Sequence, residues 1–332
     1  MQDLSAQLLD QVIEHSGVVT RKNKAAQFAR QSIFYDGKPA QPQDIARPGA
    51  KLNIQGRDYE LTPGGQGRLQ LCPLTVTPET IKGKVRVHCG YHKCLTEYSK
   101  KVYRAVCNSI FQPKGSFRHF FHRLDSFYSE CEQHTISSIS GHALDLDRFK
   151  DIQVVRFIRD PRDLLISAYF YHKRGAEAWC HLKDPTDLDW KIVNGSVPSN
   201  LPEGLSLTEY LDKSSMHDGL IAEMDFRRFH FASMLEWSDD DPRVKLYRYE
   251  DIISNERETF NDIFSFFGFS LPTRWAGAYH ARRFRAGTSA SKRKHIRDPN
   301  SGQWRKHFTP ELTKAFNQRY GDVLEKYGYP LS

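Results

Sequence analysis

Residues 85–98 read Val-Arg-Val-His-Cys-Gly-Tyr-His-Lys-Cys-Leu-Thr-Glu-Tyr, and this stretch decides the fold. Its first five residues, 85–89, have the composition of a β-strand. From Cys94 to about Cys107 an apolar stripe with helical spacing predicts an α-helix. The stripe consists of Leu95, Tyr98, Val102, Ala105 and Val106. A strand that turns directly into a helix is the unit from which parallel α/β sheets are built.

The same alternation continues toward the C-terminus. Residues 152–158 and 244–247 are further predicted strands. Directly after the first of them, Asp160 suits a helix N-cap and Pro161 the first helical position, so a helix should begin there. We therefore predict an α/β domain over residues 67–332, with a P-loop-like central parallel sheet flanked by helices.

Residues 1–66 are predicted to form a small α+β accessory domain and linker. Helical spacing at 8–13 and 25–29 precedes strands at 33–35 and 51–54, and a Gly-rich linker follows at 62–67. This order resembles the small RNA-binding module at the end of bacterial tyrosyl-tRNA synthetases. One interpretation is a packing or oligomerisation appendage. The other is RNA binding through the basic residues Arg21, Lys22, Lys24 and Arg30.

Composition limits the partners and the compartment. The 332 residues carry a formal charge of +8, which favours an anionic partner such as nucleic acid, a membrane surface or a phosphate-rich cofactor. Much of the excess lies between Arg282 and Lys306. No apolar run is long enough for a membrane span, and the N-terminus lacks a secretion signal, so we expect a cytoplasmic protein. The six cysteines have no metal-type spacing and should be reduced thiols.

The turn between the first strand and its helix is a candidate phosphate loop. A helix N-terminus offers free amides and the positive end of the helix dipole, Lys93 adds a charge, and Thr96 adds a hydroxyl. The loop lacks the Gly-Lys-Ser/Thr of a Walker A motif. Taken alone, it also fits an ordinary turn with a solvated lysine.

Two later motifs also suit phosphate. Arg159 stands at the carboxyl end of the second strand, where open α/β sheets bind ligands, and Ser167 follows eight positions later. Arg159 also fits an ion pair with a nearby carboxylate. Near the C-terminus, a basic segment at 292–303 leads into Trp304. That segment is either a solvated charge run or a loop held by its tryptophan.

Together these motifs, over residues 85–327, resemble the 3′-phosphoadenosine-5′-phosphosulfate (PAPS)-dependent sulfotransferase family. The resemblance implies that Lys93 is the catalytic lysine and that Arg159 and Ser167 hold the 3′-phosphate. It also matches Arg297, Gly302 and Trp304 to the segment that closes over the nucleotide.

Further matches follow by position. Tyr98 stands where the family has an adenine-stacking tryptophan, Tyr249 approaches the adenine, and His142 is the expected base. Leu95 and Glu97 depart from the family, which usually has glycine and threonine there. A satisfied histidine is the other interpretation of His142, and Glu97 is a competing base.

The resemblance implies transfer of a sulfuryl group from PAPS to a hydroxyl or amine of a small-molecule or carbohydrate acceptor, with release of PAP and without a metal. The segments at 111–127 and 174–216 should cap the pocket. A nucleotide or small-molecule kinase and a non-catalytic RNA-binding protein are the alternatives. The predicted catalytic residues are Lys93 and His142, and the predicted nucleotide-binding residues are Gly90, His92, Lys93, Cys94, Thr96, Glu97, Tyr98, Arg159, Ser167, Tyr249, Arg297 and Gly302.

Overall fold

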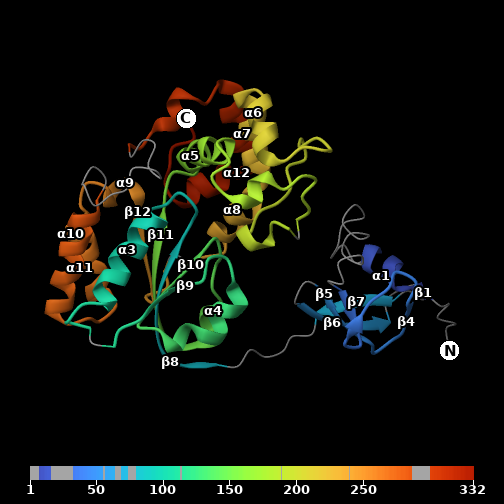
Figure 1. Ribbon diagram of the computed structural model, residues 1–332, viewed down its shortest axis with the longest axis horizontal. Helices are drawn as coiled ribbons and strands as arrows, with labels where there is room; N and C mark the ends of the chain where they lie inside the picture. Colours follow the sequence, from blue (N-terminus) through green and yellow to red (C-terminus); the bar gives the residue numbers. More distant parts are fainter. Residues whose placement is uncertain are drawn as a thin grey trace. The chain divides into compact units, whose positions relative to one another are not determined.

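A computed structural model describes residues 7–15, 33–54, 57–63, 69–73, 80–112, 114–187, 189–238, 240–285 and 300–332. The chain divides into two compact units, and the larger one begins at Thr80 (Figure 1). The sequence places this boundary near residue 66. In the structure, strand β7 (Leu69–Pro73) pairs along its whole length with β6 (Arg57–Pro63), and this ladder keeps β7 in the first unit.

The larger unit is built on a five-stranded sheet in which every pair of neighbouring strands is parallel. This confirms the predicted α/β class. In the order in which they pair, its strands are β12 (Val244–Arg248), β11 (Phe149–Ile158), β8 (Ile81–Gly90), β10 (Ile136–Ser140) and β9 (Phe117–His119).

Helices cover both faces of this sheet (Figure 1). One face carries α3 (Thr96–Cys107), α10 (Glu256–Phe266) and α11 (Leu271–Phe284). The other side carries α4 (Leu124–Glu130), α5 (Pro161–Lys173), α6 (Leu207–Lys213), α7 (Met216–Phe226), α8 (Arg228–Leu235) and α12 (Pro310–Lys326). Because the sheet is covered on both faces, the middle of β11 is a buried and mostly apolar run, which includes Val154, Val155 and Phe157.

Local sequence explains where two of these helices begin. The Asp160 carboxylate accepts from the backbone N–H of Arg162 (2.9 Å), and Pro161 is the first residue of α5, as predicted. Thr309 caps α12 in the same way through the N–H of Leu312 (3.3 Å). Helix α3 differs, because its N-cap residue is Leu95 and no described side chain caps it.

Over its described residues, the first unit is an antiparallel sheet packed against one helix. The sheet has the order β3 (Lys38–Pro39), β2 (Ile33–Tyr35), β5 (Lys51–Ile54), β6 and β7. Helix α1 (Leu9–His15) and the short pair β1 (Gln7–Leu8) and β4 (Ile45–Ala46) complete it. Its core includes Leu9, Ile33 and Leu61. The second predicted helix, at 25–29, and the predicted RNA-binding residues 21, 22, 24 and 30 lie outside the described residues.

All six cysteines are free thiols, as expected, and five of them are buried. Among the described residues, no helix combines the length and the apolarity needed to cross a membrane.

Candidate active site

A cavity of about 1040 Å³ opens in the larger unit where the carboxyl ends of β8, β11 and β12 meet. Eight predicted nucleotide-binding residues line it: His92, Lys93, Thr96, Glu97, Tyr98, Arg159, Ser167 and Tyr249. They come from three stretches of chain that are far apart in sequence. The carboxyl edge of a parallel sheet is where open α/β folds bind their ligands, so the predicted loops meet where the fold requires.

The loop between β8 and α3 is held in an unusual conformation. Lys93 (φ 69°) and Leu95 (φ 59°) both adopt the left-handed region, which non-glycine residues enter at a cost. The loop is fixed because the N–H of Cys94 and the hydroxyl of Thr96 both donate to the carbonyl of Tyr91, at 3.0 and 3.3 Å. The side chain of Cys94 is fully buried in the core. Leu95, which stands where the family usually has glycine, therefore takes a left-handed conformation that glycine adopts without cost.

Lys93 is a cation in a largely desolvated and positively charged place. Its Nζ lies 3.9 Å from the centre of the Tyr171 ring. Burial first, and then the charges of Arg174, Arg227 and Arg159, lower the pKa of Lys93 to about 8, against a smaller opposing effect of Glu177. A lysine held like this gains strongly from an anion placed beside it.

Arg159 lies on a second wall of the cavity and is only 4% exposed. Its guanidinium lies 4.2 Å from the centre of the Tyr249 ring and 3.7 Å from the Asp163 carboxylate, so the alternative of a carboxylate ion pair is also realised. Its Nη2 donates to the carbonyl of Asn300 (3.4 Å). Its buried Nε has no hydrogen-bond partner within the described part of the chain. A buried donor without an acceptor indicates a ligand position.

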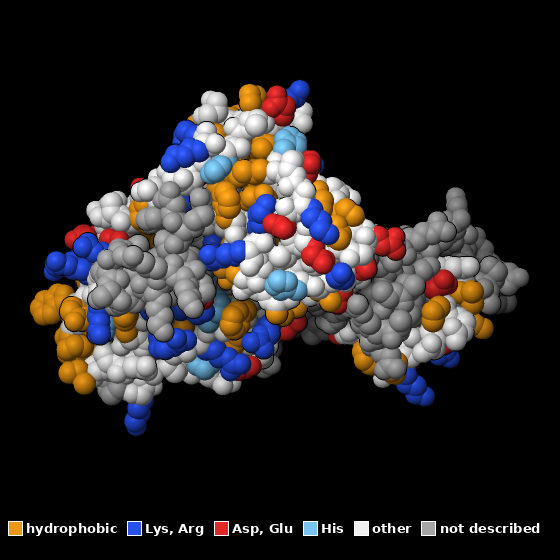
Figure 2. All heavy atoms as spheres, turned by 45° about the horizontal axis from the view of Figure 1, so that its top comes forward, with side chains coloured by type: hydrophobic (Ala, Val, Ile, Leu, Met, Phe, Trp, Pro, Cys, Tyr) orange, Lys and Arg blue, Asp and Glu red, His pale blue; other side chains and the backbone are white. Residues whose placement is uncertain are grey.

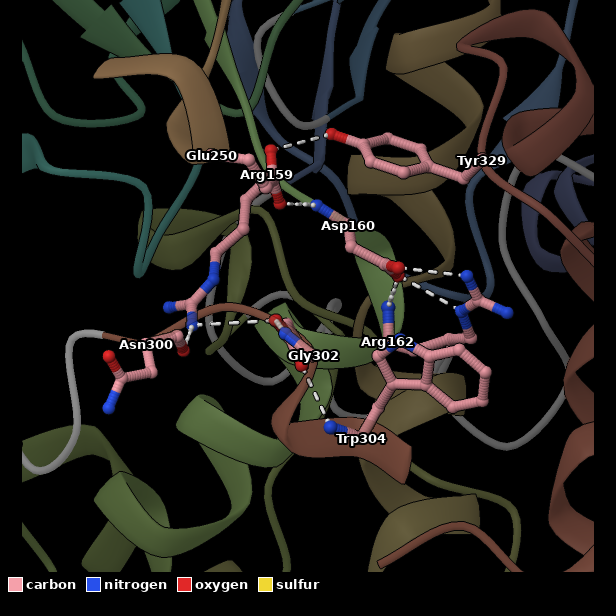
Figure 3. Close-up of polar contacts among 9 residues, drawn as sticks. Arg159, Asp160, Arg162, Glu250, Asn300, Gly302, Trp304 and Tyr329 are labelled. Atoms are coloured by element: carbon pink, nitrogen blue, oxygen red, sulfur yellow. Dashed lines mark hydrogen bonds and ion pairs between the residues drawn. The ribbon is translucent and has the colours of Figure 1, made fainter. Parts of the chain in front are cut away.

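The end of the predicted closing segment is fixed to helix α5 by one carboxylate. Asp163 accepts from the backbone N–H of Gly302 (2.6 Å) and of Trp304 (2.8 Å) (Figure 3). Gly302 has φ 77°, which explains the glycine. Arg162 lies 3.7 Å from the centre of the buried Trp304 ring, so the tryptophan anchors the segment as predicted. The predicted residue Arg297 lies outside the described residues.

A second set of contacts ties the turn after β11 to the turn after β12. Glu250 accepts from the backbone N–H of Asp160 (3.0 Å) and from the hydroxyl of Tyr329 (3.1 Å) (Figure 3). Asp160 forms a bidentate pair with Arg162 (3.0 and 2.8 Å). These bonds hold the residue that follows Arg159 and the residue that follows Tyr249, so both members of this cation–π pair have rigid supports.

Tyr98 and Glu97 both line the cavity from the first turn of α3. The Tyr98 hydroxyl donates to the carbonyl of Ala281 (2.9 Å), and its ring meets Phe260 edge to face at 5.5 Å. Glu97 is 59% exposed and pairs with Lys100 at 2.5 Å. Tyr98 is therefore fixed, whereas Glu97 has a cation beside it that lowers its value as a base.

Four predicted residues do not line the cavity: Gly90, Cys94, Gly302 and His142. The first three support the loops through their backbone. His142 follows β10, and its Nε2 lies 2.9 Å from the carbonyl of His122. Because a carbonyl only accepts, this contact fixes Nε2 as the protonated nitrogen. His122, and not His142, is the histidine of this pair that lines the cavity.

Sequence reasoning missed several cavity residues that lie far from the motifs. The most buried of them is Arg227, between α7 and α8, whose Nη2 donates to Nδ1 of His92 (3.0 Å). His230, on α8, is a further example. No spacing rule links them to Lys93, because only the packing of α7 and α8 brings them to the sheet edge.

The segments predicted to cap the pocket contribute to it in part. His119, Phe121, His122 and Arg123 of the first segment, and Glu177, Trp179, Ile192 and Val193 of the second, line the cavity. Phe120 and Trp190 are buried in the core instead, as the alternative of plain packing allows. Lys and Arg side chains, with hydrophobic ones between them, lie over the face of this unit that Figure 2 shows.

The fold and the cavity define an α/β protein with a cationic ligand site at the carboxyl edge of its parallel sheet. Residues 146–328, more than half of the chain, match the sulfotransferase domain family, and the chain belongs to this family. The match begins after the Lys93 loop and includes Arg159, Ser167, Tyr249 and Gly302. The protein is thus a sulfotransferase, as the resemblance predicted.

Solved structures show similarity at low identity. Mouse sulfotransferase SULT7A1 in complex with PAP is 13% identical, with a TM-score of 0.41 over 74% of this chain and 86% of that one. Retinol dehydratase with androsterone and the inactive cofactor PAP is 14% identical, with a TM-score of 0.43 over 92% and 95%. The complex of retinol dehydratase with retinol and PAP is 13% identical, with a TM-score of 0.43 over 92% of this chain and 95% of that one. No curated protein matches the sequence.

Proposed function

We propose that this chain transfers the sulfuryl group of PAPS to a hydroxyl or amine of a small-molecule or carbohydrate acceptor and releases PAP. The observation that supports this most strongly is that Lys93 and Arg159 line one cavity of about 1040 Å³. Such a volume accommodates a nucleotide together with a small acceptor. PAPS supplies a sulfuryl group already activated by its phosphate leaving group.

Arg159 and Ser167 are proposed to hold the 3′-phosphate. The guanidinium is pre-organised by Tyr249 below it and by Asp163 beside it, and its buried Nε lacks an acceptor in the described structure. A phosphate oxygen supplies that acceptor. Ser167 lies on α5 and adds a hydroxyl from the same wall of the cavity. Tyr98 and Tyr249 present aromatic rings for the adenine.

Lys93 is proposed to stabilise negative charge on the departing 5′-phosphate oxygen. An ammonium group in a desolvated site interacts most strongly where charge develops, so its effect is largest in the transition state. The uncapped first turn of α3 adds backbone amides beside it. We expect Lys93→Ala to lower kcat by about a hundredfold to a thousandfold.

The base that takes the acceptor proton is proposed to belong to the histidines around Gly141. His142 is the residue predicted from sequence, but its Nε2 proton is committed to the carbonyl of His122. His122 lines the cavity, and burial lowers its pKa to about 3, so it is unprotonated at neutral pH. Because His122 lines the cavity, we place the base there and expect His122→Gln to remove an acidic limb of the pH–rate profile near pH 3. Loss of that limb in His142→Gln alone would return the role to His142.

The function is tested by ligand stabilisation and by transfer of labelled sulfur. PAP should raise Tm strongly, and ATP–Mg²⁺ or RNA should not. Sulfur-labelled PAPS with a mixture of acceptors should give a labelled product with wild type and none with Lys93→Ala. Stabilisation by ATP–Mg²⁺ with transfer of a phosphoryl group would support the kinase alternative instead.

A further inference from the structure

Arg227 is a fully buried cation in the wall of the cavity. It follows α7 directly, precedes α8, and has an exposed fraction of 0%. It comes from a part of the chain that supplies none of the predicted nucleotide-binding residues. A guanidinium without solvent needs acceptors and countercharge from its surroundings, or it destabilises the fold.

The surroundings satisfy Arg227 only in part. Nη2 donates to Nδ1 of His92 at 3.0 Å, and Nε lies 3.9 Å from a carboxylate oxygen of Glu223. Within the described chain, Nε and Nη1 have no hydrogen-bond acceptor. The guanidinium thus keeps two N–H donor groups that make no hydrogen bond to a described residue.

The countercharge is also shared. Glu223 is fully buried and accepts from Nδ1 of His172 at 2.6 Å. Its other oxygen, the one nearest Arg227, makes no hydrogen bond to a described residue. Burial lowers the pKa of Arg227 to about 10, and Glu223 and Glu177 only partly offset this. The carboxylates around Arg227 therefore do not fully balance its charge, and the site can accept one more negative charge.

One histidine near Arg227, His230, supplies a neutral donor. His230 is 1% exposed, lines the cavity, and has no described hydrogen-bond partner on either ring nitrogen. Its ring meets His122 edge to face at 5.6 Å. Burial, followed by the charge of Arg227, holds the pKa of His230 well below its usual value, so this ring is neutral and offers one N–H.

We infer that the acceptor carries a carboxylate, and that Arg227 with His230 holds it beside the hydroxyl or amine that is sulfated. This inference rests on the proposed function. One guanidinium and one neutral imidazole match a single negative charge better than the two charges of a phosphate monoester. The phosphates of the donor have their own cations in Lys93 and Arg159.

The adjoining wall fits the rest of such an acceptor. Phe226, the residue before Arg227, stacks on Trp179 with a ring separation of 4.9 Å and an angle of 6°, and both line the cavity. Aromatic faces beside a buried cation suit an aromatic acid or a uronic acid, whose ring packs on apolar surface while its carboxylate is bound.

The test compares acceptors that differ in one group. We would use 4-hydroxybenzoate, 4-hydroxybenzamide and 4-hydroxyphenyl phosphate, and methyl glucuronide against methyl glucoside, with labelled PAPS. Each carboxylate should exceed its neutral partner in kcat/KM by about tenfold to a hundredfold, the range of a hydrogen bond to a charged group. The carboxylates should also raise Tm of the PAP complex, a readout that needs no turnover. Equal behaviour of the paired compounds, or preference for the phosphate, would overturn the inference.

Variants locate the effect. Arg227→Gln and His230→Gln should each reduce the preference for carboxylates while the Kd for PAP stays within about twofold. Arg228→Gln is the matched control, because Arg228 is the adjacent residue, is exposed and does not line this cavity. If Arg227→Gln fails to fold, the inference is still tested by His230→Gln and by the preference of the wild-type chain for carboxylate acceptors. A wild-type chain that binds no PAP would refute the proposed function itself, whereas PAP binding without carboxylate preference refutes only this inference.

Discussion

The lowered pKa of Lys93 makes the dependence of catalysis on pH a direct test of the site. The pKa lies near 8 because the ammonium is desolvated and faces three guanidinium groups. Raising the pH through this value removes the charge from Lys93. We therefore expect kcat/KM for PAPS, which reports the free enzyme, to fall above pH 8.

The expected magnitude follows from the titration. A group with a pKa of about 8 is about 90% protonated at pH 7 and about 10% protonated at pH 9. The value of kcat/KM for PAPS should therefore fall about tenfold between these pH values, and tenfold more for each further pH unit. Bound phosphosulfate is an anion close to the ammonium and should raise the pKa by about 1–3 units. The basic limb of kcat should accordingly appear at higher pH than that of kcat/KM.

Initial rates with labelled PAPS, from pH 6 to 10, measure both limbs. Lys93→Arg keeps a positive charge over this range and should flatten the basic limb. Arg174→Gln removes the largest charge effect on Lys93 and should move the limb upward, and Arg174 is exposed, so the fold should tolerate the change. A limb near pH 8 that persists in Lys93→Arg would refute the assignment, because another group would then be titrating.

Two further substitutions test how the closing segment is anchored. Asp163→Asn leaves one carbonyl oxygen for the amides of Gly302 and Trp304. Chemical denaturation should therefore show a free energy of unfolding lower by about 1–3 kcal/mol, and calorimetry should show weaker PAP binding. Unchanged values for both would contradict the anchoring role. Trp304→Ala removes a buried ring that packs on Arg162 and should cost about 3–5 kcal/mol in the same denaturation assay, and a loss under 1 kcal/mol would show that the ring is not a structural anchor.

Periodicity in the sequence predicted the fold where the chain obeys local rules. The strand before Gly90, the helix after it and the Asp160-Pro161 helix start all agree with the structure. Strand β10 was not predicted, because Ile-Ser-Ser-Ile-Ser is polar for a strand that is buried throughout. One of its serines, Ser138, has a tertiary partner in His119, whose Nδ1 lies 2.8 Å from the serine hydroxyl. Such tertiary compensation has no signal in the sequence.

In the site, too, the residues that local sequence patterns place could be predicted, and those that tertiary packing places could not. Lys93, Arg159 and Tyr249 each follow a strand, so the parallel sheet alone brings them to one edge. Arg227 follows a helix, and its burial depends on how α7 and α8 pack. Nothing in the local sequence separates it from its exposed neighbour Arg228. Only the tertiary structure distinguishes the two arginines.

The conformation of the Lys93 loop links these two levels. Left-handed backbone at Lys93 and Leu95 costs about 1–2 kcal/mol at each residue, and no helix or strand requires it. It persists because Cys94, between them, is fixed by its bond to Tyr91 and by burial in the core. The core thus holds Cys94 in place, with one strained residue on each side of it. This geometry places Lys93 in the wall of the cavity. The surrounding packing therefore lets leucine hold a left-handed conformation that glycine would adopt without cost.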